Sequence, residues 1–160
     1  MTSVVTNEVR DTSMLEEVAK RFASKAKGNE QIEVYVSQGS DVEVTVYKQE
    51  VENMTTANST AVGIRVINDH REGSAWAESL DEEILEQTLA NARENASIAE
   101  PDEFAALVKP SDIDDVVPVE RNGWDDSIIE TSLEEKVALT MELDKMARSY
   151  DERIHDIPSA

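Results

Sequence analysis

Apolar and polar residues alternate through much of the region between positions 32 and 66, and this pattern sets the expected fold class. The alternating apolar residues fall into three groups: Ile32, Val34 and Val36; Val42, Val44 and Val46; and Val62, Ile64 and Val66. A period of two is typical of β-strands that bury one face, most often in antiparallel sheets. The chain is therefore expected to form a mainly antiparallel sheet.

Turn-forming residues divide this region into hairpins. Gly39, Ser40 and Asp41 separate the first two groups, which predicts a turn there. The threonine-rich segment 51–57 is a candidate for a further strand, and the strand at 62–66 is expected to pair with 73–79 across a polar loop. These assignments predict a sheet of four to five strands.

Three amphipathic helices flank the sheet. Each begins with a serine followed three residues later by a glutamate, the pattern of a capping box: Ser13 and Glu16, Ser79 and Glu82, Ser132 and Glu135. The alanines of the second helix predict close packing on the sheet, and Pro101 ends it. The third helix is apolar over more than half its circumference, which predicts burial on two sides, or an exposed apolar patch if a neighbouring domain is absent.

Together these elements predict an α+β fold in the order α-β-β-(β)-β-β-α-arm-α. We expect a flexible N-terminus at 1–12, a core domain at 13–100, a Pro/Asp-rich arm at 101–131 and a C-terminal helix at 132–160 that leads into a truncated strand near 153–157. The arm is expected to pack by isolated apolar residues: Phe104, Leu107, Val116, Val117 and Trp124. The incipient strand suggests a fragment of a longer protein.

Charge and composition exclude several classes of partner. The chain has 35 acidic and 15 basic residues, a net charge of -20, which opposes binding to nucleic acid and to anionic membranes. This charge either solubilises the surface or steers cationic peptides toward it. The sequence has no cysteine, no N-terminal signal and no run of apolar residues long enough to span a bilayer, so a cytoplasmic location is expected.

His70 is the most conspicuous candidate for chemistry, because Asp69 precedes it and Ser74 follows it closely. A serine triad needs three groups held rigidly together beside an oxyanion site, and one tight reversal does not provide this. Zinc needs three or four ligands, and the other histidine, His155, is far away in the sequence. We therefore predict a solvated loop at His70, with neither catalytic residues nor metal ligands.

Other motifs give no stronger indication of chemistry. Counted from Asp112, the sixth and twelfth positions of a calcium loop hold Val117 and Gly123 instead of glycine and glutamate. No phosphate-binding glycine motif occurs, and acidic groups such as Glu50 and Glu52 form no distinctive pair.

Two tryptophans and one arginine are candidates for contacts. Trp76 and Trp124 are either core residues or interface anchors, and Arg65 forms either a surface ion pair or a contact to a ligand or domain.

The order of elements and several local signatures resemble the N-terminal domain of the TldD/PmbA family of zinc metallopeptidases. The signature residues are Gly63, Arg65, Val66 and Gly73, followed by the acid- and alanine-rich run 80–99. The resemblance covers roughly residues 14–157, and the segment "NGWDDSIIETSLEEKVAL" is closer to the PmbA-like branch.

This resemblance implies a role without catalysis. Family members bind zinc in a C-terminal domain, through an H-E-x-x-x-H helix and a cysteine, neither of which occurs here. The implied role is a non-catalytic N-terminal domain that helps to enclose an unfolded peptide substrate and to assemble a dimer. Its implied partners are its own C-terminal catalytic domain and a second TldD/PmbA-type subunit, identical or different. The alternative is a stand-alone peptide-binding or assembly module that adds a peptide strand at the edge formed by 51–57.

Overall fold

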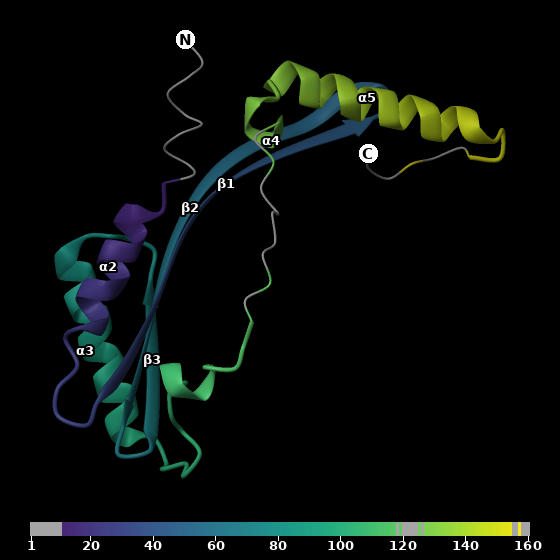
Figure 1. Ribbon diagram of the computed structural model, residues 1–160. Coiled ribbons are helices and arrows are strands. Elements are labelled where there is room, and N and C mark those ends of the chain that lie inside the picture. Colours follow the sequence, from purple (N-terminus) through teal and green to yellow (C-terminus); the bar gives the residue numbers. More distant parts are fainter. Residues whose placement is uncertain (1–10, 118, 120–124, 126, 155–156, 158–160) are drawn as a thin grey trace. The chain divides into compact units, whose positions relative to one another are not determined.

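The computed structural model describes residues 11–117, 119, 125, 127–154 and 157. They fall into two compact units, each described here by itself (Figure 1). The sheet unit lies within residues 9–39 and 59–121, and the hairpin-tip unit within 40–58 and 122–160.

Helices and strands together make an α+β fold, as predicted. In chain order the elements are α2 (Ser13–Ala23), β1 (Gln31–Tyr47), β2 (Glu50–Asn68), β3 (Arg71–Ala77), α3 (Glu82–Ile98), the short 3-10 helix η1 (Pro110–Asp112), α4 (Ser127–Glu130) and α5 (Leu133–Tyr150). The strands form one sheet in the order β1-β2-β3. Within the described residues the sheet therefore has three strands, fewer than the four to five predicted.

The predicted number of strands is too high because the turn predicted at residues 39–41 is absent from the structure. Residues 39–41 continue β1 without interruption, and the chain reverses at Lys48 and Gln49, whose φ angles are 51° and 64°. The sequence held a signal for this, because Val36 and Val42 are six residues apart and their alternation continues in phase through Gly39. The segment 51–57 is extended as expected, but it is part of β2 rather than a separate strand.

The predicted pairing after position 62 is confirmed. β2 and β3 are antiparallel, with Gly63 opposite Trp76 and Arg65 opposite Ser74. The connection is shorter than the expected loop: only Asp69 and His70 separate the strands, with φ angles of 47° and 61°. Two successive left-handed residues are typical of a tight type I′ hairpin turn.

Helices α2 and α3 lie on the same face of the sheet and form the core of the sheet unit with it (Figure 1). The core residues are almost all aliphatic: Val18, Phe22, Ile32, Val62, Ile64, Val66, Ala77, Leu85, Leu89, Ala92 and Ala96. Each large side chain buried in this way contributes about 1.5–3 kcal/mol relative to exposure.

Close packing of α3 on β3, predicted from the alanines of the helix, depends on a glycine. A Cβ added to Gly73 would overlap the backbone of Ala92 and Ala96 and would lie 2.7 Å from Ala96 Cα. Because backbone atoms cannot move aside as a side chain does, only glycine fits at this point.

Only one of the three predicted capping boxes is present. Ser132 Oγ accepts the Glu135 amide, and Glu135 accepts the Ser132 amide in return. At α2 the N-cap residue is Thr12, without a side-chain cap, so Ser13 lies inside the helix. The serine and glutamate pattern therefore predicts the cap of α5 correctly, but not the cap of α2.

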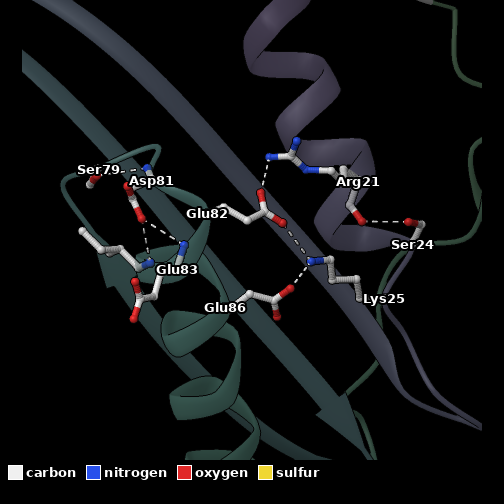
Figure 2. A network of polar contacts seen from close by, with 9 residues as sticks. Arg21, Ser24, Lys25, Ser79, Asp81, Glu82, Glu83 and Glu86 are labelled. Atoms are coloured by element: carbon white, nitrogen blue, oxygen red, sulfur yellow. Dashed lines mark hydrogen bonds and ion pairs between the residues drawn. The ribbon is translucent and has the colours of Figure 1, made fainter.

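The cap of α3 comes from a neighbouring residue instead. Asp81 accepts the backbone N–H groups of Glu83 and Ile84, while Ser79 Oγ accepts the Asp81 amide (Figure 2). The carboxylates that follow Asp81 then join α3 to α2. Glu82 pairs with Arg21 at 2.7 Å and with Lys25 at 3.3 Å, and Glu86 also pairs with Lys25 (Figure 2).

A cavity of about 490 Å³ in the sheet unit is lined by three basic residues, Lys27, Arg71 and Arg93. Two of them are engaged in the fold. Arg93 donates to both carboxylate oxygens of Glu30 at 2.8 Å, and Arg71 donates to the carbonyl of Ala99. The Arg93 bonds lower the pKa of Glu30 against the opposing effect of burial. We therefore interpret this cluster as structural.

Replacing Glu30 by glutamine should lower the free energy of unfolding by about 1–2 kcal/mol at neutral pH, because a charged hydrogen-bond pair is lost. Since the folded-state pKa of Glu30 is lowered, its contribution is present above the ordinary value of 4.5 and is lost as the pH falls through the folded pKa. Urea unfolding at several pH values should show the difference between the two proteins shrinking in acid. The exposed Glu17→Gln is the control, and an equal loss at all pH values would contradict this prediction.

In the hairpin-tip unit, α5 is fastened to the turn between β1 and β2. The carboxylate of Asp144, fully buried, accepts the Gln49 amide at 3.1 Å and Gln49 Nε2 at 2.7 Å. It also accepts Arg148 Nε at 3.0 Å, and Gln49 Nε2 donates to the carbonyl of Met141. This contact holds Gln49 in its left-handed conformation and fixes the turn that the sequence pattern missed.

The opposite side of α5 is exposed and apolar. Its four large side chains have exposed fractions of 56–87%: Leu139, Leu143, Met146 and Tyr150. Their spacing of four, three and four residues places them on one stripe of the helix. The predicted burial of this helix on two sides is therefore wrong for the described residues, because Asp144 is the buried residue of α5.

The arm is tied to the sheet unit at its start. The Asp102 amide donates to the carbonyl of His70 at 2.7 Å, and the Leu107 amide donates to Gln31 Oε1 at 2.7 Å. Of the expected anchors, Leu107 is half-buried, whereas Phe104, Val116 and Val117 are exposed. Trp124 lies outside the described residues.

The structure describes the two ends of the chain only in part. Of the N-terminal segment 1–12, only residues 11 and 12 are described, and they lead directly into α2. At the other end, residues 151–154 form a turn closed by a hydrogen bond from the Ile154 amide to the Asp151 carbonyl. The strand expected at 153–157 falls partly outside the described residues.

Candidate functional site

The turn that carries His70 does not assemble a catalytic group. His70 is exposed at the tip of the hairpin, and its carbonyl, not its ring, is hydrogen-bonded to the arm. Among the described residues, no hydrogen bond links the His70 ring to Asp69 or Ser74. Within the described part of the chain, the His70 ring therefore lacks the partners of a serine triad.

The donor set does not fit a zinc site either. Within the described part of the chain, no three residues of the types His, Cys, Asp and Glu are gathered closely enough to hold a metal ion. The sequence contains no cysteine, and its second histidine, His155, lies outside the described residues. Nor is any described helix long and apolar enough to cross a bilayer.

The face of the sheet opposite α2 and α3 carries two exposed aromatic rings. Tyr35 on β1 is 68% exposed and Trp76 on β3 is 72% exposed. Both line a hollow of about 240 Å³, together with Glu33, Gly63 and Arg65. Gly63 has no atom within 4 Å of where its Cβ would be, so it leaves the hollow open opposite Trp76. We call this surface the aromatic face.

Arg65 lies in the aromatic face between two carboxylates. Its Nε is 2.9 Å from Glu33 Oε2 and its Nη1 is 3.6 Å from Glu72 Oε2. The Nε contact is an ion pair without the alignment of a hydrogen bond. The charge of Arg65 is thus compensated within the face, whereas its chain neighbour Val66 is fully buried in the core.

A second, more open hollow lies on the other side of Trp76. It has a volume of about 540 Å³ and is lined by Ser74, Ala75 and three residues of α3: Asn91, Glu94 and Asn95. Asn95 Nδ2 donates to the carbonyl of Ser74 at 2.9 Å. A backbone group at the outer edge of β3 is therefore already occupied.

The first part of β2, in contrast to the edge of β3, has an exposed edge. β3 pairs with β2 only from Val62 onward, so in the hairpin-tip unit residues 50–58 have β1 on one side and no other strand among the described residues. All of these residues are exposed. An edge of this kind presents free N–H and C=O groups to which an extended chain can pair.

Comparison with known proteins identifies the region that contains the sheet. Residues 32–96 match the sequence profile described as PmbA/TldA metallopeptidase domain 1. This span includes nearly all of β1, all of β2 and β3 and most of α3, and with them the predicted signature positions Gly63, Arg65, Val66 and Gly73. A search of curated protein sequences gives no match.

Solved structures share the fold over most of the chain. TldE from Thermococcus kodakarensis is 24% identical, with a TM-score of 0.62 over 88% of this chain. Two candidate modulators of DNA gyrase, from Thermotoga maritima and Bacteroides thetaiotaomicron, are each 18% identical, with TM-scores of 0.67 and 0.73 over 91% and 89% of this chain. The aligned region is only 30–32% of the length of these proteins.

The profile match and the structural matches agree with the resemblance seen in the sequence. The profile covers most of the sheet and most of α3, and the shared fold extends to about nine tenths of the chain. Residues 32–96 are therefore similar to the first domain of the PmbA/TldD metallopeptidases, and the fold is shared with these solved structures.

Proposed function

We propose that this chain is the non-catalytic part of a zinc metallopeptidase and holds an unfolded peptide substrate in an extended conformation. The observation that carries the proposal is the match of residues 32–96 to the first domain of a metallopeptidase family.

The exposed edge of β2 supplies the means of holding a peptide. An extended peptide that lies along residues 50–58 would form main-chain hydrogen bonds with the free backbone groups, as an added strand does. Such bonds do not depend on side chains, so they suit substrates of varied sequence. In the complete enzyme, zinc bound in another domain would activate the attacking water; this chain would present the peptide.

Main-chain pairing can be tested with the 160-residue chain and two labelled, unstructured peptides that differ only in backbone N-methylation. One peptide is methylated at alternate positions and the other at every position. In a strand, alternate N–H groups face the neighbouring strand, so the first peptide can turn its unmethylated edge to β2 and should bind like the parent, whereas the second should lose binding. Equal binding of both peptides in fluorescence anisotropy would contradict strand addition.

We further propose that the exposed stripe on α5 is an assembly surface for another domain or subunit. Leu139, Leu143, Met146 and Tyr150 have the spacing of a helix-pairing seam. Sedimentation of the purified chain with and without a Leu143→Lys substitution tests this assignment. Self-association or subunit pairing that is lost in the variant supports the assignment, and pairing that persists unchanged contradicts it.

A second candidate function is a stand-alone peptide-binding or assembly module. The exposed edge of β2 favours this function, because residues 50–58 need no catalytic domain to accept an added strand. The genomic sequence discriminates between the two: an in-frame H-E-x-x-x-H downstream of Ala160 supports the metallopeptidase, and a stop codon supports the module.

A further inference from the structure

The aromatic face combines exposed rings with bare sheet between them. Tyr35 and Trp76 belong to the two outer strands of the sheet, and Gly63 on the central strand keeps the surface between them free of side-chain atoms. The Trp76 ring borders both hollows and is 72% exposed. Only 4% of the residues in this chain are aromatic, so two exposed rings on one surface are a concentrated feature.

The charges around these rings are mostly negative. Glu33 and Glu72 border the face with side-chain exposed fractions of 54% and 47%, and Glu94 lines the hollow on the far side of Trp76. The single positive charge of Arg65 offsets one of these three negative charges. The surface therefore attracts cations, and the net charge of -20 on the chain adds to this attraction.

Exposed aromatic faces flanked by carboxylates suit one kind of side chain. A lysine ammonium or an arginine guanidinium gains from the ring quadrupole and from the nearby negative charge at the same time. An acidic ligand would be repelled, and a neutral one would gain from the rings alone.

We propose that the aromatic face binds a lysine or arginine side chain of the unfolded peptide, with the cation over Trp76 or Tyr35. This inference rests on the proposed peptide-holding function and adds a preference to it: the aromatic face selects basic residues. The carboxylates Glu33, Glu72 and Glu94 supply the charge complementarity.

Three labelled peptides test this preference. They share an unstructured Gly/Ser/Ala sequence and carry two lysines, two glutamines or two glutamates at the same positions. The lysine peptide should bind most tightly, and acetylation of its lysines should remove the advantage. Trp76→Ala should weaken binding of the lysine peptide about five- to tenfold, with a smaller loss for Glu94→Gln. Phe104→Ala in the arm and Glu142→Gln on α5 are matched controls at exposed positions and should change nothing.

The outcomes separate this inference from the function on which it rests. Equal affinity of Trp76→Ala and Phe104→Ala for the lysine peptide, or equal affinity of all three peptides, would overturn the aromatic face as a cation site. Strand addition would still stand if N-methylation at every position abolished binding. Conversely, a lysine preference that depends on Trp76 but ignores N-methylation would support the cation site and contradict strand addition.

Discussion

Replacing Gly73 by alanine should lower the free energy of unfolding of the sheet unit by about 3 kcal/mol or more. The added methyl group has no space, because the backbone of Ala92 and Ala96 lies where it would be. Overpacking of a core costs about 1–3 kcal/mol when side chains can adjust, and here the obstacle is a helix backbone. Urea unfolding followed by circular dichroism measures the loss.

Gly63→Ala is the matched control for this substitution. Gly63 lies on the neighbouring strand, and its Cβ would meet no atom within 4 Å. Its substitution should change stability by no more than about 0.5 kcal/mol. Equal losses in the two variants would show that α3 does not approach β3 as closely as described.

Replacing Asp144 by alanine should release α5 from the turn between β1 and β2 while the sheet unit stays folded. The substitution removes the acceptor of the Gln49 amide, of Gln49 Nε2 and of Arg148 Nε. Amide hydrogen exchange should accelerate at Gln49 and along α5, and remain slow in the core strands around Ile64. Glu142→Ala, at an exposed position of the same helix, is the control.

The same contact should depend on pH. The bond from Arg148, followed by the bond from Gln49, lowers the pKa of Asp144 below its ordinary value of 3.8. The contact is therefore intact above that value and weakens as the pH falls through the folded-state pKa. Exchange in α5 that stays slow in Asp144→Ala, or that accelerates together with exchange in the core, would contradict the local role of this residue.

The spacing of apolar residues predicted most of the sheet unit correctly, because that spacing reflects which side chains are buried in the core. The strands at 62–66 and 73–79, the helix that ends before Pro101 and the close approach of its alanines all follow from which side chains face the core. The turn at Lys48 and Gln49 did not follow, since neither residue favours a left-handed conformation. A distant residue, Asp144, holds it in place, and local sequence does not contain that information.

The candidate site was less predictable than the fold for a similar reason. Tyr35 falls on the polar side of an alternating strand, and only the folded sheet shows that it lines the same hollow as Trp76. The alternation of the strand does place Tyr35 on the outer face, but it does not indicate which side chains lie beside it. Trp76 remains a predicted interface anchor, now with a defined surface around it. His70 was a candidate because of its chemistry alone, and it lies in a tight exposed turn where its backbone carbonyl accepts the Asp102 amide.

Native mass spectrometry of the 160-residue chain, mixed with zinc and an unfolded lysine-containing peptide, tests the central claim most directly. One spectrum reports bound peptide, bound metal and the intact or cleaved mass of the peptide. A non-catalytic peptide-holding domain predicts a complex of chain and intact peptide without stoichiometric zinc. Cleaved peptide, or one tightly bound zinc per chain, would contradict it.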